Sequence, residues 1–123
     1  MSCILLIEDN LLNRVLARDI LCRRGHRVIE ATSVQEGRDR LAAFVPEVVL
    51  VDIQIPGGGG EMLLREIRAE PRFAHLVVVA VTAYAMRGDR ERFLAAGFDG
   101  YLSKPIDTRL FGPEVESYLG KNS

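Results

Sequence analysis

Four short apolar runs, separated by longer amphipathic segments, constrain the fold of this chain more than any other feature. The runs cover residues 3–7, 48–51, 76–81 and 100–103. They are rich in β-branched and aliphatic residues, a composition typical of strands buried on both faces of a parallel sheet. Residues 27–30 are expected to form a further short strand. The pattern therefore predicts a parallel sheet whose strands are joined by helices.

The segment after the first strand is expected to form a helix from about Asn10 to Arg24, with Gly25 as its C-terminal cap. Four apolar residues recur there at helical spacing and predict the face that packs on the sheet. They are Leu12, Val15, Leu16 and Ile20. We interpret Cys22 in this helix and Cys3 in the first strand as small buried hydrophobes rather than a disulfide.

Four more helices complete the alternation. Ser33 followed three residues later by Glu36 indicates a capping box, which opens a second helix ending near Phe44. The other three surround residues 62–67, precede Gly97 and follow Pro105. This order predicts an α/β fold, a (βα)5 doubly wound flavodoxin-like sandwich with a five-stranded parallel sheet in the order 2-1-3-4-5. We expect residues 1–123 to form this one domain.

The composition excludes several classes of function. With 48% hydrophobic residues, 27% charged residues and a formal net charge of -1, the chain has no bulk attraction for nucleic acid. Its longest apolar run, residues 76–81, is far shorter than the roughly 20 residues of a membrane helix. We therefore expect a cytoplasmic protein with neither direct nucleic-acid binding nor membrane insertion.

Polar residues follow the apolar runs at the point where each strand is expected to end. They are Glu8, Asp9, Asp52, Thr82 and Lys104. In an open parallel sheet, ligands bind in the crevice beyond the carboxyl ends of the strands. Three carboxylates there would repel phosphate unless a cation intervened, and carboxylate oxygens suit a hard divalent ion such as Mg²⁺. The set predicts one site for Mg²⁺ and phosphoryl transfer.

Asp52 is the expected nucleophile of this site. It ends an all-apolar strand, where a charge without partners is unfavourable, and a carboxylate beside a metal can form an aspartyl phosphate. Taken alone, the other residues have simpler interpretations. Glu8-Asp9 fits a solvated helix N-terminus, Lys104 a surface lysine and Thr82 an N-cap.

The ordered motifs closely resemble the response-regulator receiver family over the whole chain. They are Glu8-Asp9-Asn10, Asp52-Ile53-Gln54-Ile55-Pro56 with Gly60, Thr82-Ala83 and Lys104-Pro105. The resemblance implies that Asp52 accepts a phosphoryl group from a phosphohistidine on a sensor histidine kinase or a histidine phosphotransfer protein. It also implies that Asp9, Asp52 and the Gln54 carbonyl bind Mg²⁺, or Mn²⁺ in its place, with Glu8 acting through a metal-bound water.

The same resemblance assigns a switch. Lys104 would pair with the phosphoryl group, Thr82 would move to hydrogen-bond it, and the Tyr101 ring would move inward, changing the face of the fourth helix, fifth strand and fifth helix for a downstream protein target. The small Ala83 leaves room for the phosphoryl group, while Gln54 and Tyr84 overhang it and slow its hydrolysis. On this interpretation the chain is no enzyme beyond its own phosphorylation and dephosphorylation.

Three alternatives differ in class or context. The run 80–86 with Gly88-Asp89 resembles single-domain regulators of the DivK type, but receivers attached to hybrid histidine kinases carry it too. Met1 just before the first strand, and an end soon after the fifth helix, favour a free-standing regulator. A Mg²⁺ phosphatase of the haloacid dehalogenase type would need a second Asp where Gln54 stands, and its other acids would come later in the chain.

Two segments depart from the family pattern. Residues 57–60 are four consecutive glycines, where the family usually shows one, and they predict a mobile loop because each has maximal backbone freedom. Gly112-Pro113 interrupts the expected fifth helix. We predict a short turn near residues 108–111, then a helix from about Gly112 with Pro113 in its first turn and Glu116 facing solvent.

Overall fold

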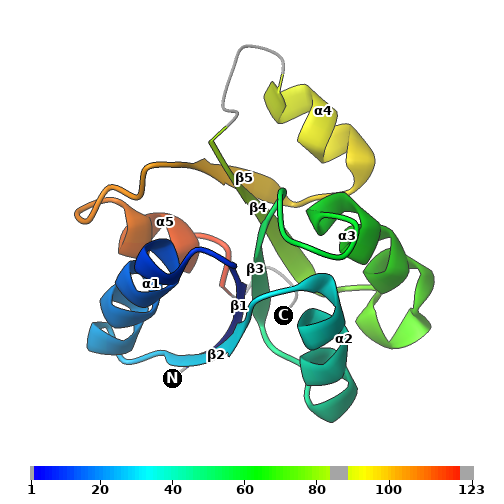
Figure 1. The fold of residues 1–123 in the computed structure, drawn as a ribbon, viewed down its shortest axis with the longest axis horizontal. Helices are drawn as coiled ribbons and strands as arrows, with labels where there is room; N and C mark the ends of the chain where they lie inside the picture. Colours follow the sequence, from blue (N-terminus) through cyan, green and yellow to red (C-terminus); the bar gives the residue numbers. More distant parts are fainter. Residues whose placement is uncertain (1, 84–88, 120–123) are drawn as a thin grey trace.

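The structure, a computed structural model, describes residues 2–83 and 89–119 and contains one five-stranded sheet flanked by helices (Figure 1). The strands are β1 (Cys3–Ile7), β2 (Arg27–Ala31), β3 (Val48–Asp52), β4 (Val77–Thr82) and β5 (Gly100–Ser103). The helices are α1 (Leu11–Arg23), α2 (Val34–Ala43), α3 (Gly60–Ala69), α4 (Asp89–Ala96) and α5 (Phe111–Glu116), with a 3-10 turn η1 (Pro71–Phe73). All strand pairs are parallel and the order is β2-β1-β3-β4-β5, which confirms the predicted fold class.

The sheet separates two apolar layers. Helices α1 and α5 cover one face, and α2, α3 and α4 cover the other (Figure 1). Every residue of β3 and β4 is buried, because these central strands have helices on both faces. Because all the strands are parallel, their carboxyl ends lie together at one end of the sheet, between the two layers of helices.

Helix α1 begins and ends as its cap residues predict, but its buried face agrees with the prediction only in part. Asn10 accepts a hydrogen bond from the Asn13 amide, and Gly25 at φ 91° closes the C-terminus. Ala17 and Leu21 are the fully buried residues, whereas the expected core residue Leu12 is 80% exposed. Ile20 packs partly buried against the core, so the expected face is right at Ile20 and wrong at Leu12.

The second helix has the predicted capping box with one change of partner. Ser33 accepts a hydrogen bond from the Glu36 amide at 3.1 Å. The Glu36 carboxylate, however, accepts from the amide and the hydroxyl of Thr32, one residue further back than a capping box requires. Two hydrogen bonds at Thr32 replace the single one expected at Ser33.

The fifth helix is broken where the sequence predicts. A turn at residues 108–110 precedes α5, which begins at Phe111 with Pro113 in its first turn. Asp107 caps the turn by accepting from the amides of Arg109 and Leu110. The expectation that Glu116 faces solvent is wrong.

Glu116 instead pairs with two bases at the end of the sheet where β2 begins. Its carboxylate lies 2.7 Å from Arg24 Nη2 and 2.8 Å from His26 Nε2. A Cβ on Gly112 would lie 2.4 Å from Arg24 Cδ, so the glycine makes room for the arginine stem. These two bases hold the pKa of Glu116 at about 2, with the Arg24 hydrogen bond as the largest cause.

Both cysteines are free, Cys3 half-buried and Cys22 exposed. The expectation that Cys22 is buried is therefore wrong, because it lies on the outer face of α1. Among the described residues, no helix is long and apolar enough to span a bilayer.

Candidate phosphoryl-transfer site

The parallel sheet brings the ends of four strands to one edge. Ile7 pairs with Val51 and Asp52 pairs with Val81, so the residues that end β1, β3 and β4 lie side by side. The Lys104 amide donates to the Thr82 carbonyl at 2.8 Å, which places the end of β5 beside the end of β4. Residues far apart in sequence thus share one edge.

Lys104 links two carboxylates there. Its Nζ lies 2.5 Å from Glu8 Oε1 and 2.8 Å from Asp52 Oδ2. Glu8 is 3% exposed and Asp52 is 7% exposed. The structure therefore places one ammonium group between two buried acids.

Asp9 completes an acidic cluster. Ligand oxygens of Glu8, Asp9 and Asp52 all lie within 4.8 Å of one another, and Asp9 is exposed to solvent. Three carboxylates against one ammonium leave an excess of negative charge. Oxygen donors in this number and charge suit a hard divalent cation.

The protonation of the cluster reflects that excess. Burial and the neighbouring Asp52 raise the pKa of Glu8 to about 7, although Lys104 opposes the rise. Burial by itself favours the neutral form of Asp52, but hydrogen bonds with Glu8, the Gln54 amide and Lys104 outweigh it and hold the pKa of Asp52 below its usual range. The two carboxylates outweigh burial at Lys104 and raise its pKa. Of the two buried acids, Asp52 is thus the one whose charged form its surroundings favour.

Backbone contacts fix Asp52 and the loop after it. The Gln54 amide donates to Asp52 Oδ1 at 3.0 Å. A Cβ on Gly60 would lie 2.9 Å from the Asp52 carbonyl oxygen, so α3 can begin this close to β3 because it begins with glycine. Gly57, Gly58 and Gly59 have φ of 99°, 121° and 84°, which explains three of the four glycines.

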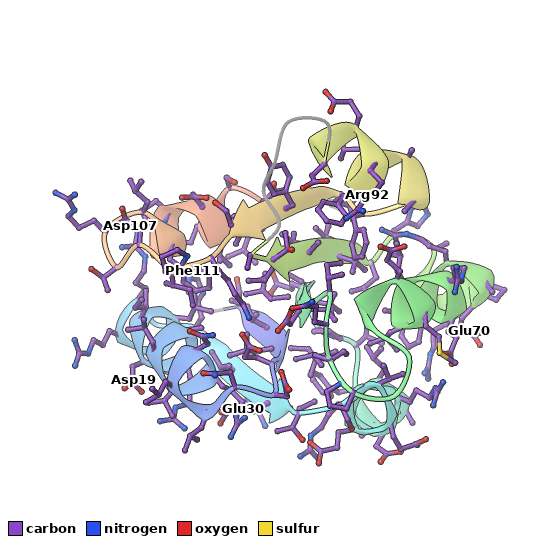
Figure 2. The ribbon with its side chains drawn as sticks, turned by 45° about the horizontal axis from the view of Figure 1, so that its top comes forward. Asp19, Glu30, Glu70, Arg92, Asp107 and Phe111 are labelled. Carbon is purple, nitrogen blue, oxygen red and sulfur yellow. The ribbon has the colours of Figure 1, made fainter. Side chains whose placement is uncertain are left out.

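The loop between β1 and α1 is held by contacts that sequence reasoning missed. The Glu8 amide donates to the Ala31 carbonyl at 2.9 Å, and Arg14 Nη1 donates to the Glu8 carbonyl at 3.0 Å. Arg14 Nε also donates to Glu30 Oε1 at 3.1 Å, and Glu30 lies at the β2 edge beside α1 (Figure 2). An arginine one turn after Asn10 is the signal that could have revealed this contact.

The expected switch residues lie around the ends of β4 and β5. Thr82 is buried and Ala83 is exposed directly after β4. The half-buried Tyr101 ring lies 6.0 Å from the Phe93 ring of α4. Tyr84 lies outside the described residues.

Comparisons with known proteins agree with this geometry. The family described as "Response regulator receiver domain" matches residues 4–113. The polar-differentiation response regulator DivK of Brucella ovis is 37% identical over 117 residues, which is 95% of each chain. The receiver domain of sensor histidine kinase PA1611 of Pseudomonas aeruginosa, solved with magnesium in its active site cleft, is 30% identical with a TM-score of 0.86, covering 97% of this chain and 98% of that one. The chemotaxis response regulator CheY4 of Vibrio cholerae shares the fold, with a TM-score of 0.90 at 18% identity over 97% of this chain and 99% of that one.

Proposed function

Because this chain belongs to the response-regulator receiver domain family, we propose that Asp52 accepts a phosphoryl group from the phosphohistidine of a histidine kinase or phosphotransfer protein in the cytoplasm. The observation that carries the proposal is Lys104 Nζ, which lies between Glu8 and Asp52 at the carboxyl edge of the sheet. A buried nucleophile, its cation and an acidic cluster for a metal meet at one point.

The acidic cluster would hold Mg²⁺, or Mn²⁺ in its place. Asp9, Asp52 and the Gln54 carbonyl are the proposed ligands, with Glu8 acting through a metal-bound water. When bound, Mg²⁺ neutralises charge on the transferred group. Support comes from the chemistry of the donors, since their oxygens lie within 4.8 Å and carry more negative charge than Lys104 balances. The receiver domain of PA1611, which is 30% identical, was solved with magnesium coordinated in its active site cleft.

The transfer itself needs one nucleophile and one leaving group. An oxygen of the Asp52 carboxylate attacks phosphorus, the P–N bond to the donor imidazole breaks, and its electron pair remains on the imidazole nitrogen. The Lys104 ammonium stabilises the charge on the transferring group. The chain thus catalyses its own phosphorylation and the later hydrolysis, and it acts as a signalling module.

We propose that phosphorylation acts on partners through Thr82 and Tyr101. A hollow of about 380 Å³ lies between α4, β5 and α5, and its lining includes Tyr101 and Tyr118. Inward movement of the Tyr101 ring would reshape this hollow, which a downstream protein would read. Ala83 would leave room for the phosphoryl group, while Gln54 and Tyr84 would slow its hydrolysis.

The proposed form is a free-standing regulator with one domain over residues 1–123. Support comes from DivK of Brucella ovis, which is matched over 95% of its own length. The 30% identity with a receiver from a sensor kinase favours a second candidate, a module of a hybrid histidine kinase. An immunoblot of the source cells separates the candidates, because only the second gives a band much larger than 13.7 kDa.

Intact-mass spectrometry after incubation with phosphoramidate and Mg²⁺ tests the proposed function. We expect a single added phosphoryl group that is absent from Asp52→Asn and from reactions in EDTA. Asp19→Asn, which changes an exposed carboxylate on α1, is the matched control and should be phosphorylated like the parent (Figure 2). Phosphorylation that persists in Asp52→Asn or in EDTA would contradict the assignment.

Nuclear magnetic resonance with and without beryllofluoride tests the switch. We expect shifts at the Asp52 pocket and also at Phe93, Tyr101 and Tyr118, since these aromatic residues lie at or beside the hollow. Shifts confined to the pocket would exclude a change of the α4, β5 and α5 face.

A further inference from the structure

Arg14 makes contacts that differ from those of the other arginines on α1. Its guanidinium reaches back to the Glu8 carbonyl at 3.0 Å and sideways to Glu30 at 3.1 Å. Its side chain is 17% exposed, against 38% for Arg18, which contacts the same Glu30 at 3.4 Å but does not reach Glu8. Arg14 is therefore the arginine that ties the acidic loop to the edge of the sheet.

The Glu8 carbonyl is a sensitive point of that loop. It shares a planar peptide unit with the Asp9 amide, so fixing the carbonyl fixes the plane from which Asp9 departs. The Glu8 amide is already tied to Ala31, and Asn10 is the N-cap of α1. Arg14 therefore restrains the peptide that lies between these two anchored points.

Asp9 depends on this restraint more than the other acids do. Lys104 holds Glu8 and Asp52 directly, whereas Asp9 is exposed and, within residues 2–83 and 89–119, no side chain holds its carboxylate. The direction of the Asp9 side chain is consequently set by its backbone. A loosened Glu8–Asp9 peptide would spread the positions of one carboxylate of the cluster.

We propose that Arg14 is a positioning residue for metal binding, holding the Glu8–Asp9 peptide so that the Asp9 carboxylate points at the ion. This inference rests on the proposed function. Glu30 orients the guanidinium and balances its charge, so the cationic side chain can lie near a cation site. The charge of Arg14 separates a positioning role from a purely electrostatic one. Removing a nearby positive charge would by itself strengthen cation binding, whereas losing the positioning contact would weaken it.

Binding of Mn²⁺ alone, followed by electron paramagnetic resonance of the free ion, tests the role directly. We expect Arg14→Met to bind Mn²⁺ about tenfold more weakly than the parent, the usual size of effect when a group that orients a metal ligand is lost. The rate of phosphorylation by phosphoramidate at saturating metal should stay within about twofold of the parent, because Asp52 and Lys104 are unchanged. Arg14→Lys should recover part of the affinity, since an ammonium can still reach the Glu8 carbonyl.

Arg18→Met is the matched control, because it loses a contact with Glu30 without touching Glu8. It should bind Mn²⁺ like the parent. Glu30→Gln keeps Arg14 but weakens its anchor and should weaken binding by a smaller factor, which decides the matter if Arg14→Met fails to fold. Unchanged or tighter binding by Arg14→Met, or equal losses in the Arg14 and Arg18 variants, would overturn the inference. If Asp9→Asn binds Mn²⁺ as the parent does, the proposed metal site itself is wrong.

Discussion

At one end of the sheet two buried carboxylates face one lysine, and at the other end one carboxylate faces an arginine and a histidine. The pKa of Glu8 is raised to about 7 in the first cluster, and the pKa of Glu116 is lowered to about 2 in the second. The same side-chain type is thus shifted in opposite directions, upward by burial and a neighbouring acid at Glu8 and downward by two bases at the more exposed Glu116. A cluster with surplus acid favours a cation ligand, whereas a cluster with surplus base holds its own carboxylate and stabilises the packing of α1 on α5.

The largest expected difference in stability between the two ends of the sheet comes from removing one basic side chain from each cluster. Lys104→Met leaves two buried acids without their cation and should lower the free energy of unfolding in EDTA by about 3 kcal/mol at pH 8. Arg24→Met leaves Glu116 paired with His26 and should lower it far less, because the Arg24 side chain is exposed to solvent. Urea titrations of both variants measure this. Equal losses of stability would show that the two clusters do not differ in burial or in their ratio of acids to bases.

Glu8→Gln should raise the free energy of unfolding in EDTA, whereas the loss of an ion pair ordinarily lowers it. The folded pKa of about 7 exceeds the ordinary 4.5, so the folded chain keeps a proton that the unfolded chain loses, and stability in EDTA falls as pH rises between these values. Glu8→Gln should remove that fall and raise the free energy of unfolding at pH 8 by about 1–2 kcal/mol, less than the full linkage value because Asp52 shifts the other way. The measurement is urea unfolding from pH 5 to pH 8. A parent protein without this fall would contradict the surplus of acid.

Glu116→Gln should lower stability, in contrast to Glu8→Gln. Its folded pKa of about 2 lies below the ordinary 4.5, so its contribution is present above that value and is lost as pH falls toward 2. We expect a loss of about 1 kcal/mol at pH 7 that disappears in acid. Glu70→Gln, at the exposed end of α3 (Figure 2), is the matched control and should be neutral. A neutral Glu116→Gln would show that α5 is held by apolar packing alone.

The smallest expected effect belongs to Gly112→Ala. The new Cβ would displace the Arg24 stem and weaken its pairing, while alanine favours a helix over glycine by up to about 1 kcal/mol. These effects oppose each other, so stability should change by under about 0.5 kcal/mol while the pKa of Glu116 rises. Carbon-13 titration of the Glu116 carboxyl measures that rise. An unchanged pKa would mean that Arg24 still pairs with Glu116 in a different side-chain conformation.

Local patterns predicted the features that local chemistry determines. The four apolar runs and residues 27–30 indicated the five strands, the alternation of strands with helices indicated their order, and Pro113 correctly indicated a broken fifth helix. Leu12 was misplaced because helical spacing alone does not say which of two neighbouring stripes packs on the sheet.

Contacts between distant residues were beyond such patterns. Glu116 meets Arg24 across 92 positions and His26 across 90, and no periodicity encodes these pairs. The residues of the candidate site were found because strand ends in a parallel sheet share one edge. Arg14 was missed because its acceptors are a backbone carbonyl and a residue of β2, and its place one turn after Asn10 is the one local sign of that contact.

Lys104 follows the last strand, whereas the carboxylates that it balances follow β1 and β3. During synthesis from the N-terminus, both acids therefore leave the ribosome more than fifty residues before their cation does. A chain stalled before β5 would carry Glu8 and Asp52 without the ammonium group that lies between them. On the proposed function, the chain becomes able to accept a phosphoryl group only after β5 and Lys104 have been synthesised.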